Sequence, residues 1–186
     1  HILGEIQSLC SGGYCNTGAG QKSTSKTTGS VTITGGLGVS GNIYGNAVYG
    51  AVWNDYAEYR EANTTEPGRV VCEHGDDTLR MSAERLQAGA SVVSDTFGFA
   101  IGKTEKAQTP IAVSGRVLVY TFEDRNTYAP GDAVCAAPGG TVSKMSREEV
   151  MTYPERIVGS VSSVPQYETW GEANVPVNGR IWIKVK

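Results

Sequence analysis

The ten residues IAVSGRVLVY, at positions 111–120, place apolar side chains two apart on either side of a Gly-Arg pair. A period of two is typical of a β-strand that buries one of its faces. The same arrangement returns near the C-terminus as VPVNGRIWIK, at positions 175–184, again around Gly-Arg. One strand pattern used twice in a chain of 186 residues predicts an internal duplication of β-strands.

Three more pairs of segments echo each other in the same order along the chain. They are EPGRVVC (66–72) and APGDAVC (129–135), TLRMSAER (78–85) and TVSKMSREE (141–149), and FAIGKT (99–104) and RIVGSV (156–161). We therefore expect a compact, internally duplicated β-head over residues 62–186, with halves of about 62–120 and 121–186. Short strands separated by turn residues predict a small β-barrel or β-sandwich.

Only two stretches favour a helix, and both are short. SAERLQAGA begins with Ser82 as a helix N-cap and ends at Gly89. SREEVMTY begins with Ser146 and stops before Pro154. Ser is a favoured N-cap residue, and Pro ends a helix. The fold class is therefore all-β, and the matching places of the two stretches support the duplication.

Residues 30–52, SVTITGGLGVSGNIYGNAVYGAV, combine a period of two with frequent glycine. Strands usually run for about 3–10 residues, so several short strands with Gly kinks fit this length better than one strand. Such a thin segment cannot bury its apolar row alone, and three intertwined copies would cover one another's edges. The apolar row of this expected trimeric β-stem is Val31, Ile33, Leu37, Val39 and Ile43. The alternative is a pair of hairpins packed on the C-terminal domain.

The expected organisation thus has three parts. Residues 1–29 form a small, polar linker or collar, residues 30–61 the β-stem and its joint to the head, and residues 62–186 the head. A chain that begins with His1 rather than Met is expected to be a fragment or a processed product.

Composition and charge narrow the classes of function. Lys and Arg total 16 and Asp and Glu total 19, so nothing favours nucleic acid as a partner. The apolar runs are too short for membrane insertion. The only histidines are His1 and His74, and GGLGVSG at 35–41 has no helix after it, so we expect no metal and no cofactor.

The stretch AVWNDYAEYRE, at 51–61, carries the strongest candidate for chemistry. Asp55 and Glu58 stand three residues apart beside Trp53, Tyr56 and Tyr59. Two carboxylates brought together push one pKa up, so that one acts as an acid while the other stays ionised. The same residues also suit a charged, aromatic joint where the stem ends and the head begins. The spacing alone favours the joint.

NDYAEYRE, followed by a PG-x-VV strand, an IG strand and a closing V-x-x-x-GR-V-x-V strand, resembles the C-terminal intramolecular-chaperone domain of phage neck-appendage and tail-spike proteins. The resemblance covers roughly residues 53–186. Upstream, VTITGGLGVSGNI at 31–43 looks like the triple-stranded β-stem of phage fibres. The resemblance implies a homotrimeric, structural virion protein, extracellular, that contacts other virion proteins and whose head brings three chains into register.

Some members of this family cut themselves off with an Asp/Glu pair just downstream of the cleaved bond, and Asp55 and Glu58 match that pair. An enzyme of this kind would perform a single-turnover autoproteolysis. Self-cleaving members carry Ser or Asp at the cleaved position, whereas residues 51–54 here are Ala-Val-Trp-Asn. This difference favours a retained structural head over a self-cleaving chaperone.

A third hypothesis is a tip that binds a host-surface glycan or protein. The polar, aromatic stretch SVPQYETWGEANVP, at 163–176, suits a recognition loop, with Tyr167 and Trp170 as its binding residues. Tyr153 is a further candidate aromatic on the head. The stretch suits a contact between trimer subunits equally well.

Overall fold

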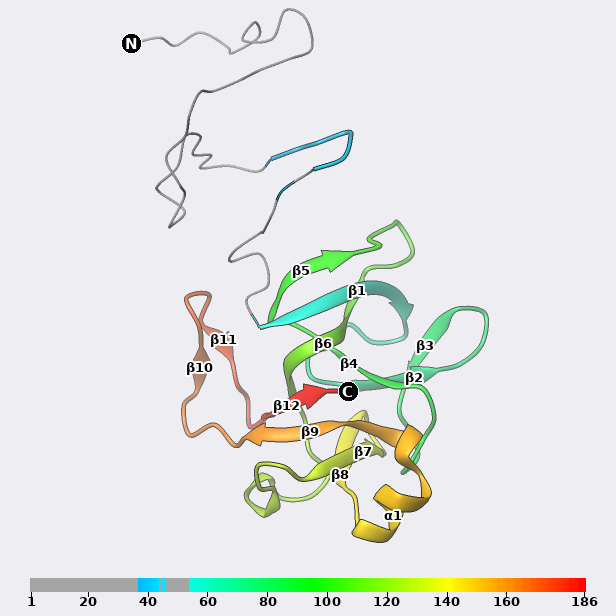
Figure 1. Cartoon of the computed structure of the whole chain (residues 1–186), viewed down its shortest axis with the longest axis vertical. Helices are drawn as coiled ribbons and strands as arrows, with labels where there is room; N and C mark the ends of the chain where they lie inside the picture. Colours follow the sequence, from blue (N-terminus) through cyan, green and yellow to red (C-terminus); the bar gives the residue numbers. More distant parts are fainter. Residues whose placement is uncertain (1–36, 44, 46–53) are drawn as a thin grey trace, which may run out of the picture. The chain divides into compact units, whose positions relative to one another are not determined.

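The computed structural model describes residues 37–43, 45 and 54–186 (Figure 1). The chain divides into two units, His1–Asn46 and Ala47–Lys186. In the first unit, the apolar side chains of Leu37, Val39 and Ile43 are 66%, 47% and 71% exposed. None of the described residues of this unit lies in a strand. Val31 and Ile33 lie outside the described residues.

The regular elements of the described part of the second unit are almost all strands, which confirms the all-β fold class. The strands are β1 (Asp55–Ala62), β2 (Val70–Glu73), β3 (Thr78–Met81), β4 (Ala90–Val93), β5 (Phe97–Ile101), β6 (Thr109–Val119), β7 (Ala133–Ala137), β8 (Thr141–Lys144), β9 (Ile157–Ser163), β10 (Thr169–Trp170), β11 (Val175–Pro176) and β12 (Ile181–Val185). One short helix, α1 (Arg147–Thr152), and two 3-10 turns, Arg125–Thr127 and Pro154–Arg156, complete the described elements.

The strands of the first half pair in a closed circuit. β1 pairs with β3, β3 with β2, β2 with β4, β4 with β6, and β6 returns to β1. β5 lies outside the circuit and pairs in parallel with β1. The interior of this circuit holds Val71, Leu79, Val93 and Ile111, with Ala62 packed against them.

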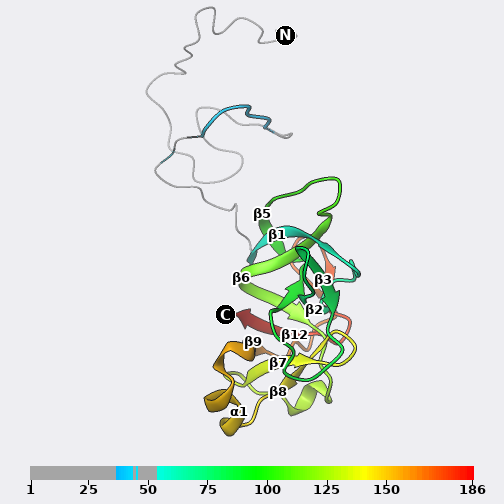
Figure 2. The same ribbon diagram turned by 90° about the vertical axis from the view of Figure 1, so that its right-hand side faces the viewer.

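The second half repeats this order of pairing and shares β6 with the first. β6 pairs with β12, β12 with β9, β9 with β7 and β7 with β8. A parallel bridge from Thr121, just after β6, to Val142 in β8 closes the second circuit, as the parallel pairing of β1 with β3 closes the first. In Figures 1 and 2 the strands of the first half fill the upper part of this unit, and β7, β8 and β9 of the second half lie in its lower part.

The pairings match three of the four sequence echoes. Each Pro-Gly segment leads into the strand that heads a hairpin, β2–β3 in one half and β7–β8 in the other. The echo of FAIGKT and RIVGSV does not correspond in the same way. β9 pairs with β7, but the strand that pairs with β2 is β4, whereas β5 pairs with β1. Short apolar strands with one Gly look alike in sequence whatever their neighbours, which explains this mistaken match.

The stretch 111–120 is the strand common to both circuits. Residues before Gly115 pair with β1 and β4, and residues after it pair with β12. Gly115 has a φ of 108°, a backbone conformation that residues with a Cβ rarely adopt. Glycine therefore lets one strand bend from the first circuit into the second.

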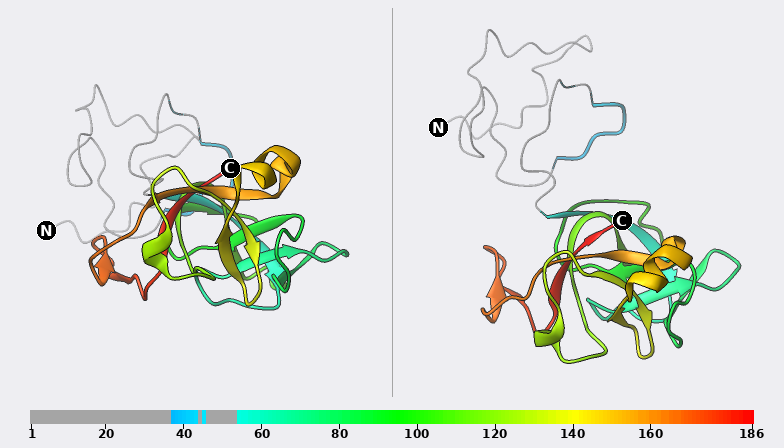
Figure 3. Two further views of the ribbon diagram at one scale, coloured as in Figure 1. Left: turned by 90° about the horizontal axis from the view of Figure 1, so that it is seen from below. Right: turned by 60° about the horizontal axis from the view of Figure 1, so that its bottom comes forward.

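The strand is more deeply buried than alternation predicts, because both of its faces are covered. Val117 and Val119 face the main core between the two halves. Leu118 faces the other side and is covered by Trp182, Val175 and Val177. The β10–β11 hairpin carries part of this cover and stands out from the body of the unit in Figures 1 and 3.

One of the two expected helices forms and the other does not. α1 begins after Ser146, whose side chain and that of Glu149 make a capping box. The prediction of a helix from Ser82 is wrong. The buried Ser82 hydroxyl donates to the carbonyl oxygen of Ala137, 2.6 Å away, and Leu86 has a φ of 60°. Hydrogen bonds to β7 thus hold this segment as a loop, and its Arg85 pairs with Glu149 of α1.

Candidate functional site

The first residues of β1 are held by the Gly-Arg pair of β6. A Cβ on Gly115 would lie 2.3 Å from the Asn54 carbonyl oxygen, so only glycine lets the two strands come this close. Arg116 donates its backbone N–H to the same oxygen, at 3.1 Å. Its guanidinium donates to Asn54 Oδ1, and Asn54 Nδ2 donates back to the Arg116 carbonyl oxygen at 2.7 Å. Asn54 is therefore tied to β6 by backbone and side chain together.

Asp55, the next residue, is fully buried. The Thr96 hydroxyl donates to its Oδ1 at 2.8 Å, and Oδ2 has no hydrogen-bond partner among the described residues. The pKa of the Asp55 carboxyl is raised to about 6, chiefly because burial disfavours the charged form. Hydrogen bonds from the Ser94 and Thr96 hydroxyl groups lower this pKa, and the charge of Asp95 raises it. A carboxyl in this state can hold or release a proton near neutral pH.

Arg180, of the second Gly-Arg pair, holds the loop beside Asp55. Arg180 is 2% exposed and donates to both carboxylate oxygens of Asp95, at 3.0 and 2.8 Å. Asp95 lies between Ser94 and Thr96 in the loop that supplies the hydrogen bond to Asp55. The Gly-Arg pair at 115–116 thus fixes Asn54, and Arg180 fixes the loop whose Thr96 donates to Asp55.

Glu58 does not share this site. Side chains alternate across a strand, so residues three apart point to opposite faces. Asp55 and Ala57 are buried, whereas Tyr56 and Glu58 are half-buried on the other face. Glu58 lines a groove of about 260 Å³ together with Arg60, Val113, Lys186 and other residues of β4, β6, β9 and β12. Within one chain the two carboxylates therefore do not form an acid pair.

The tyrosines of β1 contact β5 rather than the Asp55 carboxyl. Tyr56 stacks on Phe99 with ring centroids 5.5 Å apart, and Tyr59 meets Phe97 edge-on at 6.1 Å. Trp53 lies outside the described residues. The ring contacts of Tyr56 and Tyr59 thus lie within the pair of strands β1 and β5.

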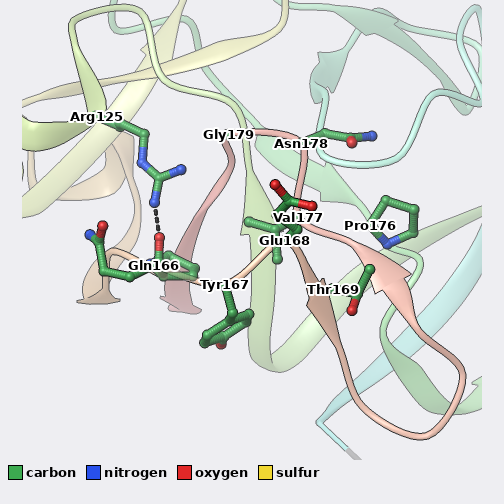
Figure 4. Close-up of a pocket in the computed structure, with 10 residues that line it drawn as sticks. Arg125, Gln166, Tyr167, Glu168, Thr169, Pro176, Val177, Asn178 and Gly179 are labelled. Carbon is green, nitrogen blue, oxygen red and sulfur yellow. Dashed lines mark hydrogen bonds between the residues drawn. The ribbon is translucent and has the colours of Figure 1, made fainter.

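Tyr167 and Trp170 have different surroundings. Tyr167 is 45% exposed and, with Arg125, Gln166, Glu168 and Asn178 among others, lines an open groove of about 480 Å³ (Figure 4). Its hydroxyl accepts a hydrogen bond from Trp182 Nε1 at 2.8 Å, which fixes the ring. Trp170 packs edge-on against Trp182 at 4.9 Å and belongs to the cover over Leu118. The structure thus gives Trp170 a packing role and leaves Tyr167 as the aromatic side chain of the groove.

The described residues contain no cluster of three or more His, Cys, Asp and Glu side chains arranged for a metal ion. Cys72 and Cys135, which match in the sequence echo, are both buried and unpaired. No helix within residues 37–43, 45 and 54–186 is long and apolar enough to cross a membrane.

The chain has a fold found in a phage protein. It is similar to the crystal structure of the pre-mature bacteriophage phi29 gene product 12, with a TM-score of 0.55 and 15% identity, over 80% of this chain and 24% of that one. The chain thus spans about a quarter of the length of gene product 12. A crystal structure of a C-terminal fragment of the same phi29 protein aligns with a TM-score of 0.47 and 16% identity, over 71% of this chain and the whole fragment.

No protein-family model and no curated protein matches the chain. At 15% identity, the likeness to gene product 12 concerns the fold alone. The roles of individual residues are therefore argued from their own contacts in this chain.

Sequence reasoning missed most of the residues around Asp55. The strand echo includes Arg116 and Arg180, but period-two alternation gives no reason to expect that both arginines serve the start of β1. Ser94, Asp95 and Thr96 form a short polar run that looks like an ordinary turn. Their position against Asp55 depends on pairing between strands 41 or more residues apart, which a local pattern does not contain.

Proposed function

We propose that the chain is a structural virion protein, a homotrimeric phage fibre or spike component whose C-terminal head drives trimerisation and brings the stem into register. The observation that carries the proposal is the exposure of Leu37, Val39 and Ile43. Apolar side chains at a spacing of two or four, exposed in one chain, need other chains to cover them. The fold shared with a region of phi29 gene product 12 supports a phage context.

The division of labour between stem and head follows from their different packing. Gly-rich strands specify register weakly, and long-range pairing forms slowly. The head has its own buried core within a single chain, with fourteen residues in the main cluster. A head that folds alone and then associates would hold three stems at the same starting residue, since Asn54 and Asp55 are fixed to β6 and the 94–96 loop.

The test is the mass of the full chain, measured under native conditions and then after denaturation on the same sample. We expect a trimer under native conditions and only full-length chains after denaturation. Monomers that persist at high protein concentration would overturn it.

Self-cleavage is the second candidate, and the buried Asp55 carboxyl favours it. Its raised pKa and its unpartnered Oδ2 leave it able to accept or donate a proton beside the Asn54–Asp55 segment. Because Glu58 lies on the other face of β1, an Asp/Glu pair would require Glu58 of a second copy.

If the chain cleaves itself, the denatured sample should contain two shorter chains, produced by cleavage near residue 54. The full-length chain should then persist in Asp55→Asn and, if a pair acts, in Glu58→Gln. Full-length chains alone from the wild-type protein after prolonged incubation would exclude self-cleavage and leave the structural role.

A further inference from the structure

β5 is the end strand of the large sheet and carries no charged side chain. Its sequence is Phe-Gly-Phe-Ala-Ile, and among the described residues its one paired neighbour is β1. Phe99 is 46% exposed and Ile101 is 44% exposed. Proteins usually protect an edge strand with charges, Pro or a covering segment, because unpaired backbone groups beside apolar side chains invite another chain. β5 has none of these within residues 97–101.

The apolar surface continues from β5 across β1 to β6. Tyr56 stacks on Phe99 at an interplanar angle of 17°, so the two rings form one aromatic cluster across β1 and β5. Ile101 is level with Glu58, two register positions after Phe99 and Tyr56. Val113, 44% exposed, is the bulged residue of β6 beside the Glu58 groove. We name the surface made by Tyr56, Phe99, Ile101 and Val113 the β5 face.

The β5 face lies where the chain passes from its N-terminal segment into the head. β1 and β5 run parallel, with Asp55 level with Phe97 and Tyr56 level with Phe99. Asp55 is the first residue of β1 and follows the stretch 30–53 directly along the chain. Whatever brings several copies of residues 30–53 together therefore brings several copies of the β5 face together.

We infer that the β5 face is the surface through which one copy of the head docks on another. This inference rests on the proposed trimer and names its contact. The occupant is a second copy of this chain, because Tyr56 of the face follows, along the chain, the segment that needs copies. The surroundings suit a subunit contact: apolar and aromatic residues form the centre, and the charged side chains of Glu58 and Arg60 line the groove beside Val113.

The chain offers a matched control for this surface. Phe122 is 60% exposed, follows β6 in the second half and belongs to neither the β5 face nor the Glu58 groove. Phe99→Asp and Phe122→Asp therefore remove aromatics of similar exposure, and only the first removes one from the proposed contact.

The experiment measures native mass of full-length chains across a dilution series. Loss of a central aromatic from a subunit contact weakens association by about tenfold or more. We expect Phe99→Asp to dissociate at concentrations where the wild-type protein and Phe122→Asp remain trimeric. Circular dichroism of each variant reports whether the head is folded.

A second measurement does not depend on how Phe99→Asp folds. With p-benzoyl-phenylalanine in place of Phe99, illumination of the trimer should join copies of the chain, and the same probe in place of Phe122 should not. The inference would be overturned if the wild-type protein is a trimer, Phe99→Asp is equally trimeric at every dilution, and the probe at position 99 joins no copies. That result would leave the proposed function intact. A wild-type chain that is monomeric throughout would overturn both. Products with a different virion or host protein, in place of a second copy, would also overturn the inference.

Discussion

At the scale of single residues, Gly115 and Asp55 have the most demanding environments. Gly115 combines a positive φ with a neighbouring backbone too close for a Cβ. Asp55 is a carboxyl in a buried site, where the Thr96 hydroxyl donates a hydrogen bond to its Oδ1. The backbone strain at Gly115 and the buried carboxyl of Asp55 both occur at the start of β1.

Gly115→Ala tests the close approach of β1 to β6. The new Cβ would meet the Asn54 carbonyl oxygen at 2.3 Å and the Asp55 Cα at 2.7 Å. We expect a loss of about 2 to 4 kcal/mol in the free energy of unfolding, from strain and overpacking together. Urea or thermal unfolding gives the value.

Gly179→Ala is the control within the same sequence echo. Gly179 also has a positive φ, of 74°, but nothing lies within 4 Å of the position of a Cβ. This variant should lose only the backbone cost of about 1 kcal/mol. Equal losses in the two variants would show that the approach of Asn54 is unimportant.

Asp55→Asn tests the buried carboxyl through the pH dependence of stability. Below about pH 4 the carboxyl is protonated in the folded and the unfolded chain alike. Between pH 4 and 6 the unfolded chain releases its proton, whereas the folded chain, with a pKa of about 6, retains it. Stability therefore falls as the pH rises through this window and stays lower above it, by about 3 kcal/mol for a rise of about two units.

The measurement is the difference in unfolding free energy between Asp55→Asn and the wild-type protein from pH 4 to pH 8. The difference isolates Asp55 from Glu123, Asp132 and Glu149, whose lowered pKa values give the opposite slope. We expect the variant to gain stability relative to the wild-type protein as the pH rises through 4 to 6. A difference that stays constant with pH would contradict the raised pKa of Asp55.

At the scale of elements, the β10–β11 hairpin shows how a segment that resembles a recognition loop can serve packing. Trp170 packs edge-on against Trp182, and Val175 and Val177 cover Leu118. The sequence of the loop is polar and aromatic, as in a binding loop, because one of its faces remains in water. Its other face closes the second side of β6 and β12.

Trp170→Ala tests the cover. Loss of the half-buried indole and its contact with Trp182 should destabilise the head by about 2 kcal/mol. Met151→Ala, which truncates a side chain that is 74% exposed on α1, should change stability by less than about 0.5 kcal/mol. Thermal unfolding of both variants makes the comparison, and a neutral Trp170→Ala would return Trp170 to the candidate binding residues.

At the scale of the whole molecule, the proposed trimer has a head that associates first and a stem that is then brought into register. Ile43, 71% exposed, belongs to the expected apolar row of the stem, whereas Phe99 belongs to the β5 face. A head that drives association should keep three chains together when the stem is damaged.

Ile43→Asp tests this division. We expect the variant to retain the native mass of the trimer, because its heads are intact, and to become more sensitive to proteolysis around residues 37–43, because its stems no longer pack. Native mass and limited proteolysis on the same sample measure the two effects. Dissociation of Ile43→Asp to monomers would instead make the stem the driver of association.

Patterns that depend on near neighbours in the chain predicted much of this protein correctly. The period of two around Gly115–Arg116 and Gly179–Arg180 indicates the strands β6 and β12. The two Pro-Gly segments directly precede β2 and β7, and Ser146 is the N-cap of α1. These features depend on backbone conformation and on hydrogen bonds over a few residues. The all-β class follows from them without any knowledge of which strands pair.

The candidate site depends on contacts that no local pattern records. Asp55 and Glu58 are close in sequence, yet alternation and the packing of β1 send one into the core and the other to a groove. Thr96, Arg116 and Arg180 reach the start of β1 only because two strand circuits share β6. Burial and pairing over long separations are properties of the assembled sheet, since the sheet alone determines which side of each strand faces water.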